Sequence, residues 1–246
     1  MGLAWSTMGP DDVWVAYADE FYDSLNETNR AVRPVARHTG HSREIRSDEF
    51  AEVFAKVREL IRECPRLRRM HFKVLFLDDA AEIEGNMPHT FGDAVMLPTR
   101  YFKRLSFDDQ VELLIHEMVH VYQRKFPIEC HRLLTSVMGY TVIGTLSTHP
   151  DYDRVRRNPD LNDVLYANKQ HEYALSIVSP NATSVRDAQL VRYDARTHKP
   201  NPTSDAHFGG EAGKKAGKEH PYEHMAYSVA DMLTHGRLPA KWRARL

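Results

Sequence analysis

The residues best suited to chemistry are two histidines four positions apart, in the segment His116-Glu117-Met118-Val119-His120. On an α-helix, residues four apart project from one face, so both imidazoles can reach a single metal ion. Glu117 then lies where its carboxylate can take a proton from a metal-bound water. The spacing predicts a zinc site with His116 and His120 as ligands and Glu117 as general base. The competing interpretation is two solvent-facing histidines on an ordinary amphipathic helix.

The flanking residues predict the helix that carries this motif. Ser106 is placed as the N-cap of a helix over residues 107–125, and Asp109 follows three residues later in a capping-box pattern. Apolar residues at helical spacing form a core face made of Val111, Leu114, Ile115, Met118, Val119 and Tyr122. The two motif histidines fall on the opposite side of the helix, and Glu117 falls at the border.

Other elements are predicted around this helix from periodicity and breakers. They are a helix over 47–63 capped by Ser47, a strand over 71–77, an extended run over 90–97, a helix over 129–138, and a last helix over 222–234 opened by Pro221. The run over 90–97 is predicted as an edge strand that holds an extended substrate by main-chain hydrogen bonds. Short apolar runs near residues 164, 173 and 190 predict short strands or loops.

This order of helix, strand, edge strand and active-site helix resembles the core of the zincin superfamily of zinc metallopeptidases. Four short sequence segments also resemble a group of metallopeptidase-like proteins of large DNA viruses and marine microbes. They are Pro88-His89-Thr90-Phe91-Gly92, His116-Glu117-Met118-Val119-His120-Val121-Tyr122-Gln123, Asn158-Pro159-Asp160-Leu161 and His220-Pro221-Tyr222-Glu223.

The resemblance implies a fold, a cofactor and a substrate class. The expected fold is one α+β zincin-like domain over 1–246, with a small mixed sheet whose edge strand packs on the active-site helix, and a C-terminal helix. Residues 1–48 are then an N-terminal extension, and 139–219 a loop and strand insertion around the cleft. The expected activity is zinc-dependent hydrolysis of a peptide or protein, with Zn²⁺ as cofactor.

Catalytic zinc usually takes three protein ligands, so one more is needed. The metzincin pattern requires glycine and histidine where this chain has Gln123 and Phe126, which excludes that branch. Glu223 resembles the helical glutamate ligand of gluzincins and is the predicted third ligand. The aspartate that many gluzincins carry four residues later is here Tyr227, which leaves the orienting partner of a ligand histidine open. His131 would instead give a three-histidine site, as in DNA–protein crosslink proteases. Further alternatives are His171, Glu172, His220 and His224.

Amide hydrolysis builds negative charge on the carbonyl oxygen, so the site also needs a donor to that oxygen. Zincins often use a tyrosine or histidine from outside the motif. Tyr227 is the predicted catalytic donor, with His220, His224 and Tyr166 as alternatives. The segment Asn158-Pro159-Asp160 is interpreted as a simple turn.

Composition limits the partners. The 246 residues carry 33 Lys+Arg and 34 Asp+Glu, a net charge of −1, and this balance argues against a nucleic-acid partner. No apolar run is long enough to predict a membrane span. Two cysteines, Cys64 and Cys130, are expected as free thiols of a soluble, cytoplasmic or virion-associated protein. Met1-Gly2 fits a myristoylation pattern. The rival functions are a non-catalytic zinc-stabilised module and a three-histidine, DNA-associated protease.

Overall fold

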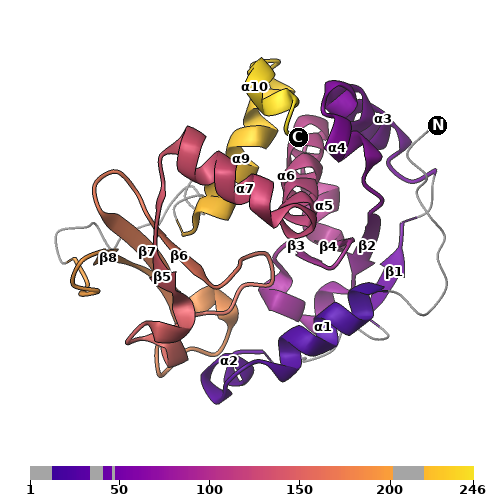
Figure 1. Cartoon of the computed structure of the whole chain (residues 1–246). Coiled ribbons are helices and arrows are strands. Elements are labelled where there is room, and N and C mark those ends of the chain that lie inside the picture. Colours follow the sequence, from indigo (N-terminus) through magenta and orange to yellow (C-terminus); the bar gives the residue numbers. More distant parts are fainter. Residues whose placement is uncertain (1–12, 34–40, 46–47, 202–218) are drawn as a thin grey trace.

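The computed structural model describes residues 13–33, 41–45, 48–201 and 219–246, and it is a mixed α+β structure (Figure 1). Its largest sheet has four strands in the order β1-β2-β4-β3. These strands are β1 (Ser42–Glu44), β2 (Lys73–Leu77), β3 (His89–Phe91) and β4 (Ala94–Pro98). Strand β2 runs parallel to β4, and the other two pairings are antiparallel. The prediction of a small mixed sheet is confirmed.

The predicted single edge strand over 90–97 is wrong. The chain forms a hairpin there, in which β4 lies inside the sheet and only β3 lies at its edge. Gly92 makes the turn with a φ of 56°, a backbone conformation that favours glycine. A Cβ atom at Gly92 would also lie 2.9 Å from a ring carbon of Tyr17 and 3.3 Å from the Cα atom of Trp14, so the first helix packs closely on this hairpin.

Helices cover both faces of this sheet. Alternate residues of β2 and β4 pack on one side against α3 (Ala51–Leu60) and α6 (Phe107–Lys125), and on the other side against α1 (Val13–Asp23). Because both faces are covered, all five residues of β2 and all five of β4 are buried. Helix α9 (Pro221–Thr234) packs along α6, and the short helices are α2 (Glu27–Ala31), α4 (Pro65–Arg69), α5 (Thr99–Arg104), α7 (Pro127–Leu133) and α10 (Ala240–Arg243).

Residues 139–201 build a separate set of strands, drawn at the lower left of Figure 1. Strand β5 (Thr141–Thr145) pairs with β6 (Val164–Ala167), and β7 (Glu172–Ile177) pairs with β8 (Gln189–Asp194), both antiparallel. The short strands predicted near residues 164, 173 and 190 are therefore confirmed. These strands have a hydrophobic cluster of their own, which includes Leu175 and Tyr193. We refer to residues 139–201 as the strand lobe.

The helix boundaries follow the sequence signals where those signals were local. Helix α6 has the predicted bounds, and Ser106 Oγ accepts a hydrogen bond from the Asp109 amide at 3.2 Å. Helix α9 begins at Pro221 as predicted. The predicted helix over 129–138 is α7, which continues as a π-helical turn over Leu134–Met138. The N-cap predicted at Ser47 and the pattern at Met1-Gly2 lie outside the described residues.

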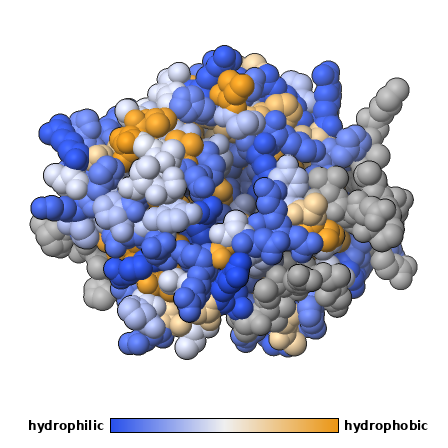
Figure 2. Space-filling view, turned by 60° about the horizontal axis from the view of Figure 1, so that its bottom comes forward, coloured by the Kyte–Doolittle hydropathy of each residue, from blue (hydrophilic) through white to orange (hydrophobic). Residues whose placement is uncertain are grey.

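Within the described ranges, no helix combines the length and the apolar character needed to cross a membrane. Figure 2 shows one face of the molecule, on which most residues are hydrophilic and hydrophobic residues form small separate groups. Exposed apolar residues scattered in this way are ordinary for a protein surface. The face shown in Figure 2 therefore has no large hydrophobic patch of the kind that marks a docking surface.

Candidate active site

The structure brings together the two motif histidines and Glu223, which the sequence places far apart. His116 Nε2 and His120 Nε2 lie 3.0 Å from each other, and Glu223 Oε2 lies 3.4 Å and 3.5 Å from them. Three tetrahedral ligands about 2.0–2.1 Å from a zinc ion would be about 3.3–3.4 Å apart. The three atoms therefore already form a triangle of the size that a tetrahedral zinc site requires. Among the described residues, no other histidine, cysteine or acidic cluster has this geometry.

The motif residues are buried, contrary to the interpretation as solvent-facing histidines. The exposed fractions are 5% for His116, 3% for Glu117 and 1% for His120, and Glu223 is 7% exposed. On α6 taken alone, the two histidines lie on the side opposite the apolar core face. Helix α9 packs on that opposite side, so α6 is covered all around at the motif.

A glutamine orients one of the histidines. His120 Nδ1 lies 2.9 Å from Gln123 Oε1, and Gln123 Nε2 donates to the carbonyl oxygen of Tyr222 at 2.8 Å. When His120 is neutral and its Nδ1 donates to Gln123, Nε2 keeps a lone pair that can bind a metal ion. Gln123 thus performs the orienting role that the sequence left open. It also ties α6 to the first turn of α9, next to Glu223.

Tyr227 contacts the other histidine. Its ring centroid lies 4.2 Å from that of His116, with the rings tilted by 53°. His116 Nδ1 is buried and has no hydrogen-bond partner among the described residues. The position where many gluzincins hold an acidic partner therefore supplies a ring contact instead.

The charges within the group favour one protonated histidine when no cation is present. Burial opposes a charge on His120, yet the neighbouring carboxylates of Glu223 and Asp160 outweigh it and raise the pKa of His120 to about 10. Burial lowers the pKa of His116. Burial alone would raise the pKa of Glu223, but the two histidines hold it well below its ordinary value. An anionic carboxylate beside two imidazoles is a donor set that suits zinc.

Glu117 lines the same cavity as His116 and Glu223. Its Oε2 atom is buried and accepts no hydrogen bond from the described residues. Burial, and then the charge of Asp160, raise the pKa of Glu117 well above its ordinary value. A divalent cation nearby would lower that pKa, because opposite charge favours the carboxylate. A buried carboxylate oxygen without a partner, beside a group of this geometry, is able to accept a proton.

The turn predicted at Asn158-Pro159-Asp160 is confirmed, because the Leu161 amide donates to the Asn158 carbonyl oxygen at 3.1 Å. This turn also forms a wall of the site. Asn158 Nδ2 lies 3.5 Å from Glu223 Oε1. Asp160 Oδ1 accepts hydrogen bonds from the amide and the hydroxyl of Thr90, at 2.8 Å and 2.6 Å. Arg124 donates to the carbonyl oxygens of Pro159, at 2.9 Å, and of Thr90, at 3.3 Å. Only residues far apart in sequence make these contacts, so no local signal reveals them.

These contacts occupy the free main-chain groups at the centre of the edge strand β3. The outward amide and carbonyl of Thr90 are both hydrogen bonded to side chains, so neither is available to an added strand. The prediction that an extended substrate pairs along this segment is therefore wrong at Thr90.

The alternative third ligands lie elsewhere. His131 is exposed, and its Nδ1 lies 3.4 Å from the Tyr166 hydroxyl. His220 caps α9, because its Nδ1 accepts from the Tyr222 amide, and its Nε2 lies 3.1 Å from the carbonyl oxygen of Val164. His171 and Glu172 belong to the strand lobe, where Glu172 forms an ion pair with Arg192 at 3.6 Å.

The structure also separates the candidate oxyanion donors. His220 has both ring nitrogens engaged, and His224 Nδ1 is 2.7 Å from the Tyr140 hydroxyl. The hydroxyl of Tyr166 is directed to His131. Tyr227 lines the same cavity as Glu117 and Glu223, which has a volume of about 380 Å³. Of the predicted donors, Tyr227 is the one that borders this cavity.

No protein-family model, curated protein or solved structure matches this chain. The buried side chains define, within a mixed α+β protein, a His–His–Glu group held between two packed helices, with a glutamate beside it.

Proposed function

We propose that this protein is a zinc-dependent metallopeptidase of the zincin type, with His116, His120 and Glu223 as the residues that hold the ion. The observation that carries the proposal is the size of the ligand triangle, with edges of 3.0, 3.4 and 3.5 Å, beside the unused oxygen of Glu117. When bound, zinc supplies a Lewis acid that lowers the pKa of a coordinated water to about 7.

The remaining steps belong to side chains of this chain. Glu117 is the general base that takes the proton of the attacking water, and it then passes that proton to the leaving amine. Tyr227 donates its hydroxyl hydrogen to the carbonyl oxygen as negative charge develops there. Burial raises the pKa of Tyr227, so its hydroxyl stays protonated as a donor. Gln123 acts through His120 and is a positioning residue.

The substrate of the proposed enzyme is a peptide or protein, and its place of action is intracellular. The two cysteines, Cys64 and Cys130, are free and buried, which is typical of proteins from reducing compartments such as the cytoplasm. The near-neutral charge gives no support to a nucleic-acid partner.

The test is Glu117→Gln, which keeps the shape of the side chain and removes its basicity. We expect zinc to stay bound and the hydrolysis of peptides to fall by about 10²–10⁴-fold, the usual contribution of a general base. Glu59→Gln is the matched control, because it makes the same change in an exposed residue of α3. Full activity in Glu117→Gln would contradict the mechanism. A parent protein that zinc stabilises, but that cleaves no peptide in a broad mixture, would favour the non-catalytic zinc module.

A further inference from the structure

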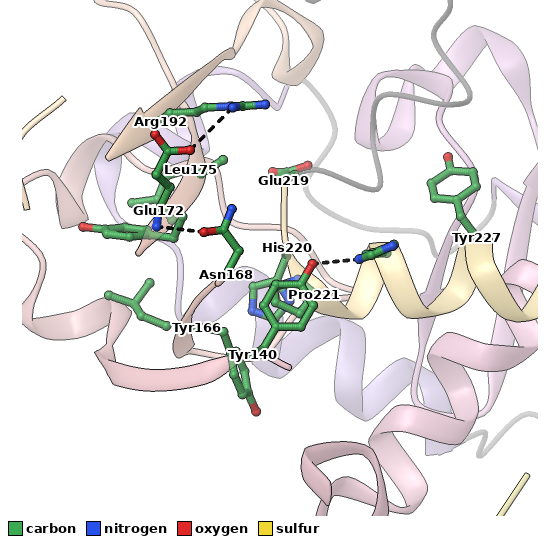
Figure 3. A pocket seen from close by; sticks show the side chains of 14 residues that line it. Tyr140, Tyr166, Asn168, Glu172, Leu175, Arg192, Glu219, His220, Pro221 and Tyr227 are labelled. Atoms are coloured by element: carbon green, nitrogen blue, oxygen red, sulfur yellow. Dashed lines mark hydrogen bonds and ion pairs between the residues drawn. The ribbon is translucent and has the colours of Figure 1, made fainter. Parts of the chain in front are cut away.

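A second cavity of about 380 Å³ lies beside the candidate metal centre, between the start of α9 and the strand lobe (Figure 3). We name it the tyrosine cavity, after the apolar residues that line it, Tyr140, Leu165, Tyr166, Tyr173, Leu175 and Pro221. Tyr227 and Glu219 line both this cavity and the one in front of the metal group. The two cavities therefore adjoin within one helical turn of Glu223.

Two of the tyrosines that line this cavity, Tyr140 and Tyr173, have hydroxyl groups that already have partners. The Tyr140 hydroxyl is 2.7 Å from His224 Nδ1. The Tyr173 hydroxyl is 2.7 Å from His149 Nε2 and 2.7 Å from His198 Nδ1. Hydroxyl groups that already have partners compete little for a ligand, so the walls act mainly as aromatic and aliphatic surface.

Each carboxylate or guanidinium group that lines the cavity is in an ion pair, and the partner of Glu219 is Arg156, which is not part of the lining. Figure 3 shows Glu172 and Arg192 at one end and Tyr227 at the other, and the Glu172–Arg192 ion pair has a length of 3.6 Å. Glu219 is held by Arg156 at 2.8 Å. The charges of these two carboxylates and two guanidinium groups cancel. A charged ligand would therefore lose its hydration in the cavity without gaining a group of opposite charge. An uncharged ligand has no such cost.

We propose that the tyrosine cavity is the specificity subsite of the enzyme and binds a large uncharged side chain, above all an aromatic one, of the residue next to the scissile bond. This inference rests on the proposed function. It follows from the position of the cavity beside the ligand Glu223, its volume, its ring-lined walls and its balanced charge. The closed edge at Thr90 adds to the argument, because side-chain pockets must then supply much of the binding.

The experiment compares peptides that are identical except at the residue beside the cleaved bond. We expect the zinc-loaded protein to cleave the phenylalanine, tyrosine and leucine peptides at least tenfold faster, in kcat/KM, than the alanine, lysine and glutamate peptides. Ala174 also lines the cavity and is half-buried. Ala174→Phe should fill the space, so that the preference for phenylalanine over alanine falls at least tenfold.

Thr141→Phe is the control, because it adds a ring to an exposed position of the same lobe and should keep the parent profile. If Ala174→Phe does not fold, Tyr140→Ala replaces it and should weaken the preference by enlarging the cavity. Cleavage that ignores side-chain size, or an equal loss for all peptides in a folded Ala174→Phe, would overturn the cavity assignment alone. If the parent cleaves no peptide of the set with zinc, the proposed function fails, and the role of the cavity fails with it.

Discussion

The identity of the third ligand can be decided by comparing Glu223→Ala with His131→Ala. In the proposed zinc site, Glu223 supplies one of the three ligand atoms and the only negative charge among them. Residues that merely orient metal ligands alter affinity by about 10–100-fold, so loss of a ligand should exceed 100-fold, or about 2.8 kcal/mol. His131 is exposed and lies outside the group, so His131→Ala should change zinc affinity less than about twofold. Glu223→Gln keeps the shape but not the charge and should fall between the two.

The assay is a competition titration of zinc against a chromophoric chelator at one pH, with parent and variants measured side by side. Thermal unfolding without metal shows whether each variant is folded, which matters because Glu223 is buried next to His120. If His131→Ala loses the metal and Glu223→Ala retains it, the site is a three-histidine one. The gluzincin-like assignment is then refuted.

Three further predictions concern the surroundings of the site and the thiols. Gln123→Ala should weaken zinc binding by about 10–100-fold in the same titration, because the His120 ring loses its hydrogen-bond partner. Unchanged zinc affinity would show that Gln123 does not orient His120. Asp160→Ala should lower the free energy of unfolding, measured in urea, by about 1–3 kcal/mol, because the Thr90 amide loses its buried acceptor. Asp160→Asn should lower it by less. Equal stability of the parent and both variants would contradict this prediction.

The third prediction is that Cys64 and Cys130 resist alkylation at pH 8 until the protein unfolds, when two thiols should react. Burial raises the pKa of Cys64 to about 11, and burial also raises that of Cys130. Because the folded state holds these thiol protons more tightly than the unfolded chain, their contribution to stability is complete below about pH 8.5 and is lost as pH rises toward 11. Rapid labelling of the native protein would contradict the burial.

Local features of the sequence determined the motif helix and the short strands. Ser106, the apolar periodicity that follows it, and Pro221 act within one or two turns, so the bounds of α6 and the start of α9 could be predicted. The spacing of His116 and His120 likewise fixes that their ring nitrogens can meet, because the helix itself sets that geometry.

Only the tertiary structure decided what surrounds those two histidines. The packing of α9 on α6 buries His116 and His120 and brings Glu223 Oε2 to within 3.5 Å of their Nε2 atoms. On α6 alone, both histidines lie opposite the apolar face and would face solvent. The chain turns at Gly92 into a hairpin, and Asp160 accepts a hydrogen bond from the Thr90 amide. For these two reasons the edge strand is not open along residues 90–97, although the sequence alone predicts an open edge there. These outcomes depend on contacts between residues distant in the chain, whose geometry is set by how whole elements pack. The pattern of any one segment cannot contain that information.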